Sequence, residues 1–201
     1  MADEDRIAEK TDEELAREAR GGSRRSFEVL ACRYKRRLFV YLRPRLASDQ
    51  DAEDLVQETF LKLFRNIGSY DPAYRFSTWL YTSANRLAID SFRKSAVERG
   101  RLVAARERDI PDPASRGDGE AGASSVWDAA RSLGADRYRV LWLRYGEDMT
   151  VEEIAAVLGR SRLAVRVLLH RARTSLVGRL GPDAGCAVRT KSDAARQAAG
   201  D

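Results

Sequence analysis

The sequence predicts an all-α protein made of two small helical domains joined by a flexible linker, with a helix-turn-helix in the C-terminal domain. Three observations lead to this fold class. Apolar residues recur at steps of three and four over most of the chain, as on one face of a helix. A stretch rich in Pro, Gly, Ser and charge interrupts this pattern. Near the C-terminus, two helical segments are separated by a single glycine. We therefore divide the chain into an acidic segment 1–22, a domain 23–95, a linker 96–126, a domain 127–180 and a polar tail 181–201.

Charge is distributed in blocks, and the balance of the whole chain is basic. The net charge is +5 and the pI is near 9.4, which suggests a polyanionic partner. Residues 23–45 are basic with only Glu28 opposing, residues 47–60 carry five acids and no base, and residues 160–180 carry six arginines and no acid. Alternating blocks predict several different surfaces.

Composition excludes several classes of site. Cys32 and Cys186 lie far apart in the sequence and His170 is the only histidine, so we expect no metal site and no histidine-based catalytic site. No carboxylate pair, nucleophile–base pair or phosphate loop indicates an enzyme. We expect no membrane insertion and a cytoplasmic location, because no apolar run is long enough for a span and the N-terminus is acidic.

Three helices are predicted in the first domain. The first has a core stripe from Phe27 to Tyr41 and ends or kinks at Pro44. The second covers 51–64, with Ser48 or Asp49 as its cap. A loop follows at 66–75, and the third helix runs from about Ser77 to Lys94. The inward positions of the second and third helices are predicted to be Ala52, Leu55, Val56, Thr59, Phe60, Leu63, and then Leu80, Ala84, Leu87 and Ser91.

The second predicted helix has an unusual outward face. Asp54, Gln57, Glu58 and Leu61 follow one another at i, i+3, i+4 and i+7, so acids and an exposed leucine share one side. One interpretation is a solvated acidic face, and the other is a docking surface for a protein.

The second domain has the layout of a helix-turn-helix. Thr150 and Glu153 form a capping box, Gly159 allows the turn, and Ser161 can cap the next helix. The residues predicted to face the core are Ile154, Ala155, Leu158, Val165, Leu168 and Leu169. The second helix leaves a cationic stripe outward, formed by Arg162, Arg166, His170, Arg171 and Arg173, which suits DNA phosphates and base edges. A solvated basic helix is the alternative, but solvated faces usually mix both signs of charge.

Both domains resemble those of the extracytoplasmic-function (ECF) sigma factors. "DAEDLVQETFLKLF", "FSTWLY" and "AIDSFRK" match the first conserved domain of that family, and "RYRVLWLRYGEDMTVEEIAAVLGRSRLAVRVLLHRAR" matches the second, in the same order and separated by a linker. The resemblance implies a subunit that binds core RNA polymerase, directs it to promoter DNA and helps to open the strands. It implies no catalysis, no cofactor and no small-molecule substrate, and it makes an anti-sigma factor an expected partner.

The resemblance also assigns roles to residues. The helix 51–64 corresponds to the one that docks on the basic clamp helices of the polymerase β′ subunit, and the second domain to the one at the β flap. The residues assigned to polymerase binding are Asp51, Asp54, Gln57, Glu58 and Leu61.

The residues assigned to the −10 element surround the loop and the third helix. They are Tyr70, Tyr74, Phe76, Trp79, Asn85, Arg86, Arg93 and Lys94. Aromatics and arginines can stack unpaired bases and neutralise phosphates. Trp79 could instead be a core residue. The family usually has Asn where this chain has Arg86, and Asn85 stands one residue earlier, so the base preference at −10 is open.

The residues assigned to the −35 element belong to the recognition helix. They are Arg160, Ser161, Arg162, Arg166, Val167, His170, Arg171 and Arg173. The family's Gly-Thr is Leu163-Ala164 here, and Val167 replaces a usual polar residue, so an apolar contact with a thymine methyl is expected there. A lone histidine is more often a packing residue, but His170 lies away from Val165 and Leu169.

Two other functions remain as alternatives. A dimeric LuxR-like or other helix-turn-helix regulator would need a ligand or phospho-acceptor domain, which residues 23–95 do not resemble. A protein-binding helical adaptor would not require the arginines of 160–180.

Overall fold

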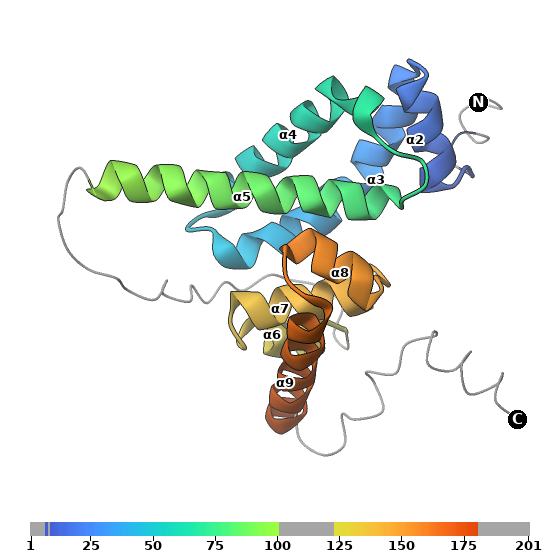
Figure 1. The fold of residues 1–201 in the computed structure, drawn as a ribbon. Helices are drawn as coiled ribbons and strands as arrows, with labels where there is room; N and C mark the ends of the chain where they lie inside the picture. The colour runs from blue at the N-terminus through green and yellow to red at the C-terminus, as the bar shows by residue number, and fades with distance from the viewer. Residues whose placement is uncertain (1–6, 8, 101–122, 181–201) are drawn as a thin grey trace, which may run out of the picture. The chain divides into compact units, whose positions relative to one another are not determined.

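A computed structural model describes residue 7 and residues 9–100 and 123–180, with side chains described except at 94–100 and 123–125 (Figure 1). From Asp12 onward the helices and short helical turns are, in chain order, α2 (Asp12–Arg20), α3 (Arg24–Leu42), η1 (Arg43–Arg45), α4 (Asp49–Arg65), η2 (Ile67–Ser69), α5 (Phe76–Gly100), α6 (Ala123–Arg131), α7 (Ala135–Leu141), η3 (Trp142–Gly146), α8 (Val151–Leu158) and α9 (Arg162–Leu180). The chain divides into two compact units. We call α2 to α5 the N-terminal domain, and α6, α7, α9 and the start of α8 the C-terminal domain. The predicted all-α, two-domain class is confirmed.

Helix α2 is an element that the sequence analysis did not predict. Residues 1–22 were expected to form only an acidic segment, yet Asp12–Arg20 is helical and packs against α3. Thr11 and Glu14 form a full capping box, and Leu15, Ala16 and Ala19 are buried. The acids of the first turn favour the helix, because they lie at the positive end of its dipole. Acidity therefore marks the beginning of a helix here.

Helices α3 and α4 follow the predicted stripes. Phe27, Tyr34 and Tyr41 are buried on α3, which passes into the short turn η1 that contains Pro44. Ser48 caps α4, and its hydroxyl oxygen accepts a hydrogen bond from the Asp51 amide at 3.1 Å. The buried positions of α4 are Ala52, Leu55, Val56, Thr59 and Leu63, with Phe60 half-buried.

Helix α5 is longer than predicted. It begins at Phe76 and continues through Gly100, six residues beyond the expected end at Lys94. Leu80, Ala84 and Leu87 are buried as predicted, but Ser91 is exposed, and Ala88 takes the inward position near the middle of the helix. The first residues of the predicted linker 96–126 are therefore helical, because α5 continues to Gly100. The last residues of that linker are helical as well, because α6 begins at Ala123. The remainder of that linker and the tail 181–201 lie outside the described residues.

The C-terminal domain packs α6 and α7 against α9. Its core includes Tyr138, Leu141, Val165 and Leu176, all of them buried. The rings of Trp127, Tyr138 and Trp142 form a cluster beside this core, with the two tryptophan centroids 4.9 Å apart. Among the helices of the described residues, none is long and apolar enough to cross a membrane.

Candidate functional site

The outward face of α4 carries the side chains that the sequence predicted there. Asp54, Gln57 and Glu58 are exposed, and 55% of the Leu61 surface is accessible. The Gln50 amide donates a hydrogen bond to one oxygen of the Asp54 carboxylate at 3.0 Å. An acidic surface with a leucine in it results, on the side opposite the buried stripe.

Two residues of α4 differ from the predicted polymerase-binding set. The carboxylate of Asp51 accepts hydrogen bonds from the amide and hydroxyl of Ser48, at 3.1 and 2.8 Å, so it belongs to the start of the helix. Phe64 is 44% exposed and one turn beyond Leu61, and the sequence analysis missed it. Its ring also touches that of Phe27, with centroids 5.1 Å apart. The i+3 spacing from Leu61 was the signal that could have found it.

The predicted −10 aromatics divide into supporting and exposed side chains. Tyr70 and Phe76 are fully buried, so the accessible base-stacking rings expected at these two positions are not observed. Tyr70 donates a hydrogen bond from its hydroxyl to the Tyr74 carbonyl at 2.7 Å, which fixes the loop before α5. Burial raises the pKa of Tyr70 to about 12. Tyr74 itself is 66% exposed.

Trp79 lies at the edge of this cluster. It is half-buried, and its ring centroid is 5.4 Å from that of Tyr70 and 6.0 Å from that of Phe76. Part of the indole is therefore packed against these rings and part of it is accessible.

Polar residues farther along α5 are also separated by the structure. Arg86 is exposed, and Arg93 is exposed beside Asp90 at 3.9 Å. Asn85 is buried, and its side-chain oxygen accepts a hydrogen bond from Arg45 at 3.2 Å. Asn85 therefore does not reach the surface that carries Arg86. The Lys94 side chain lies outside the described residues.

The helix-turn-helix geometry is present as predicted. Thr150 and Glu153 cap α8 reciprocally, at 2.8 Å from the Thr150 amide to the Glu153 carboxylate and 3.2 Å from the Glu153 amide to the Thr150 hydroxyl. Gly159 has φ +62°, a left-handed conformation that glycine adopts without steric cost. Ser161 caps α9 by accepting from the Ala164 amide at 3.2 Å.

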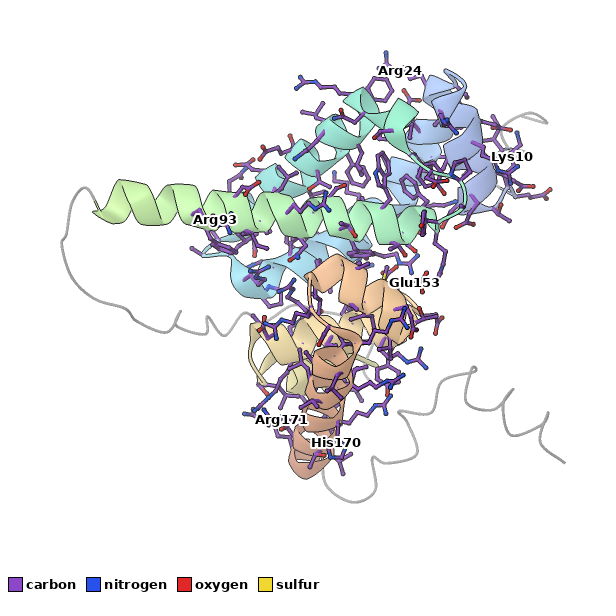
Figure 2. The ribbon with its side chains drawn as sticks, viewed as in Figure 1. Lys10, Arg24, Arg93, Glu153, His170 and Arg171 are labelled. Atoms are coloured by element: carbon purple, nitrogen blue, oxygen red, sulfur yellow. The ribbon has the colours of Figure 1, made fainter. Side chains whose placement is uncertain are left out.

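Cations cover the solvent side of α9. Every residue of the predicted stripe is exposed, namely Arg162, Arg166, His170, Arg171 and Arg173, and Arg160 and Val167 are exposed as well. His170 and Arg171 project from the helix surface (Figure 2). His170 is therefore not a packing residue in the described structure.

The arginines of this surface differ in their partners. Arg160 forms an ion pair with Asp136 at 2.6 Å, and Arg162 lies 3.8 Å from Glu152. Arg166 and Arg171 form no ion pair with any other residue that the structure describes. Arg173 also forms no ion pair with the residues that the structure describes, but its guanidinium lies over the Tyr145 ring, 5.5 Å from the centroid. Arg166 and Arg171 are therefore the cations of this surface that are most available to an anionic ligand.

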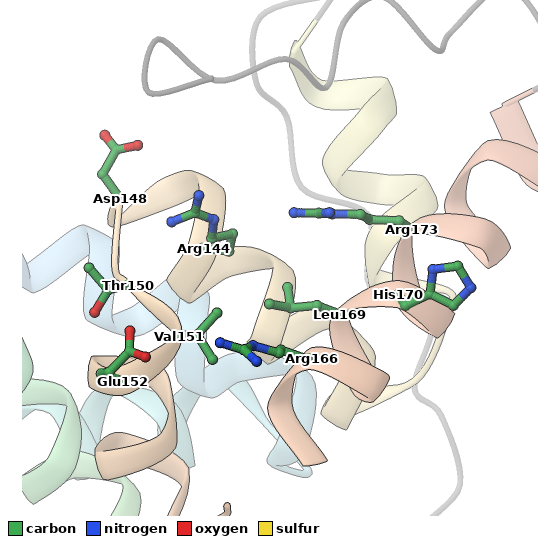
Figure 3. Close-up of a pocket in the computed structure, with 9 residues that line it drawn as sticks. All are labelled: Arg144, Asp148, Thr150, Val151, Glu152, Arg166, Leu169, His170 and Arg173. Atoms are coloured by element: carbon green, nitrogen blue, oxygen red, sulfur yellow. The ribbon is translucent and has the colours of Figure 1, made fainter. Parts of the chain in front are cut away.

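A polar cavity of about 530 Å³ lies beside the stripe, at the start of α8 (Figure 3). Arg144, Arg166 and Arg173 line it from η3 and α9, and Thr150 and Glu152 line it from the start of α8. The Arg144 guanidinium donates a hydrogen bond to the Met149 carbonyl at 2.9 Å, which fixes this cation in the lining of the cavity. Arg144 thus adds a cation near the N-terminus of α8, and no pattern in the sequence had indicated it.

Comparison with known families assigns the two domains. Sigma-70 region 2 matches residues 30–97, and Sigma-70, region 4 matches residues 124–176. The sigma factor CarQ of Myxococcus xanthus is 33% identical over 165 residues, which cover 81% of this chain and 93% of CarQ. The ECF sigma factor BldN of Streptomyces coelicolor is 32% identical over 175 residues, covering 85% of this chain and 66% of BldN.

The chain belongs to the ECF-type RNA polymerase sigma factors. It is a non-enzymatic protein that directs RNA polymerase to promoters, and the regulator and adaptor alternatives are excluded. Helix α2 lies outside the region 2 match.

Solved structures agree with this assignment. CnrH in complex with the cytosolic domain of CnrY is 27% identical, with a TM-score of 0.57, covering 87% of this chain and 98% of CnrH. The sigma factor RpoE of Bartonella quintana, solved in complex with the anti-sigma factor NepR, shares the fold, at 24% identity and a TM-score of 0.53 over 76% of this chain and 92% of RpoE.

Proposed function

We propose that this sigma factor binds core RNA polymerase through the outward face of α4, and that the clamp helices of the β′ subunit receive it. The single observation that carries the proposal is the surface formed by Asp54, Gln57, Glu58 and Leu61, opposite the buried stripe of the same helix. Carboxylates on such a surface steer a basic partner and fix its register, and an exposed leucine supplies apolar contact. Phe64 extends the apolar part by one turn.

The proposal assigns promoter opening to the start of α5. Tyr74 and the accessible side of Trp79 offer faces for unstacked bases of the −10 element, and Arg86 and Arg93 offer charge to the phosphates. Tyr70 and Phe76 act as support beneath these residues, since both are buried.

The proposal assigns −35 recognition to α9, with this domain held at the β flap. Arg166 and Arg171 have no ion-pair partner in the described part of the chain, so their guanidinium groups are free to reach guanine edges. Arg144 and Arg173 flank the same surface and are suited to phosphate contacts, because arginine binds phosphate oxygens in a bidentate manner.

We also propose that a protein inhibitor regulates this sigma factor. CnrH, which is 27% identical to this chain, was solved in complex with the cytosolic domain of CnrY, and a complex of a relative with a second protein supports this proposal.

Charge reversal on α4 tests polymerase binding. Asp54→Lys with Glu58→Lys replaces two steering carboxylates by like charges, and we expect the affinity for core polymerase to fall by roughly 30-fold or more, about 2 kcal/mol. The affinity is measured by titration of labelled sigma factor with core enzyme, and far-UV circular dichroism checks the fold.

A matched double variant separates the site from net charge. Glu28→Lys with Asp90→Lys gives the same change in charge on exposed residues of α3 and α5, outside the helix that carries the Asp54–Leu61 surface. It should bind core polymerase nearly as wild type does. Equal losses for both pairs would mean that the surface of α4 is not the binding site.

A further inference from the structure

Two exposed aliphatic side chains lie in the middle of the cationic surface of α9. Leu163 is 71% exposed and Val167 is 42% exposed, and they are neighbours at i and i+4 on the helix. The residues that anchor α9 to its domain, Val165 and Leu169, are buried on the opposite side. Neither residue of the aliphatic pair belongs to the buried core of the domain.

The position of this pair is the one from which a recognition helix reads bases. The N-terminal part of such a helix enters the major groove. Leu163 lies in the first turn of α9, and helical geometry places Arg166, Val167 and His170 on the same side. Unpaired cations on both flanks favour DNA as the occupant of this surface, because an apolar protein partner would leave those charges desolvated.

The chemistry of the major groove limits which group of a base an aliphatic side chain can contact. Hydrogen-bond donors and acceptors line the base edges, and the C5-methyl of thymine is the apolar group among them. We propose that Leu163 and Val167 contact thymine methyl groups, so that this sigma factor selects thymine at the −35 positions facing the first two turns of α9. The inference rests on the proposed −35 role of α9, and it adds Leu163 to the residues that set specificity.

Removal of a single methyl group tests the proposal. The full chain is assembled with core polymerase, its preferred −35 sequence is obtained by selection, and each thymine is replaced in turn by deoxyuracil. Deoxyuracil keeps every hydrogen bond of thymine and lacks only the methyl. We expect wild-type affinity to fall about fourfold at each contacted position, as for burial of one methyl group.

Variants assign the contacts to the two residues. Leu163→Ala should bind the thymine and deoxyuracil promoters equally at the position that Leu163 contacts, and should still prefer thymine at the position that Val167 contacts. Val167→Ala should give the converse result. Val177→Ala is the matched control, since Val177 is 41% exposed on the same helix but lies near its C-terminal end. It should discriminate as wild type does.

The outcomes separate this inference from the proposed function. If the holoenzyme binds its promoter specifically but tolerates deoxyuracil at every −35 position, the thymine inference is wrong and the −35 assignment stands. Discrimination that persists in both Leu163→Ala and Val167→Ala would also overturn it. If wild-type holoenzyme shows no preference for any −35 sequence, the assignment of α9 itself fails.

Discussion

Asp12 joins the first turn of α2 to α3, and its removal should destabilise the N-terminal domain. One carboxylate oxygen accepts from Arg33 Nη1 at 2.6 Å, and the other accepts from the Tyr34 hydroxyl at 2.5 Å. Arg33 Nη1 also donates to the Lys10 carbonyl at 2.9 Å, just before α2. The Asp12 and Arg33 side chains are only 24% and 29% exposed, so water replaces these contacts poorly.

The magnitude follows from these two contacts. A hydrogen bond to a charged group contributes about 1.5–3 kcal/mol, and the two contacts share one carboxylate and are partly screened. Asp12→Ala should therefore lower the free energy of unfolding by about 2–3 kcal/mol. Tyr34→Phe removes only one of the contacts and should cost about 1.5 kcal/mol. Glu28→Ala breaks the exposed Arg24–Glu28 pair and should cost less than about 0.5 kcal/mol.

A urea titration of the full chain, followed by the backbone amide signals of α2 and α3 in NMR spectra, measures all three variants. The combination of Asp12→Ala with Tyr34→Phe should lose less than the sum of the single losses, because both remove the same hydrogen bond. The reasoning fails if Asp12→Ala unfolds within about 0.5 kcal/mol of wild type, or if Glu28→Ala costs as much as Asp12→Ala.

Two further predictions concern aromatic residues. Trp79→Ala should reduce strand opening more than closed-complex binding, because part of the indole is accessible beside the loop. The permanganate reactivity of the −10 thymines measures strand opening. Wild-type reactivity in a folded variant would show that Trp79 is a packing residue. Burial raises the pKa of Tyr138 to about 12 from 10, so the folded state holds the phenol proton more tightly than the unfolded state does. The free energy of unfolding of the C-terminal domain should therefore keep its full value below pH 10 and fall between pH 10 and 12. Urea unfolding across this range measures the fall, which Tyr138→Phe should reduce; an equal fall in that variant would assign it to other groups.

Helical periodicity predicted most of the fold and the surface of α4. The repeat that buries Leu55 and Val56 also places Asp54 and Glu58 outward, because one helix has only one buried side. The same reasoning placed His170 and Arg166 on the exposed side of α9. Local spacing is sufficient in these cases, since the answer depends only on the helix itself.

Residues that are buried by contacts with other helices could not be predicted from local spacing. Phe76 is buried because its ring meets that of Tyr34, with centroids 5.6 Å apart, and Tyr34 comes from another helix. Asn85 is turned toward Arg45 in the same way. No local sequence pattern encodes such contacts between helices. The aromatic residues around the loop 66–75 were therefore all predicted to be accessible.

The distribution of tryptophans gives each domain its own optical signature. Trp127 and Trp142 lie 4.9 Å apart with Tyr138 stacked on Trp142 at 24°, whereas Trp79 stands among Tyr70 and Phe76 in the N-terminal domain. Two indoles at such a separation couple their electronic transitions, so the C-terminal pair should produce an indole–indole exciton couplet in circular dichroism. Trp79 has no second indole beside it in the described N-terminal domain and should not produce that couplet. A ligand that disturbs one domain can thus be distinguished spectroscopically from a ligand that disturbs the other, without any attached label.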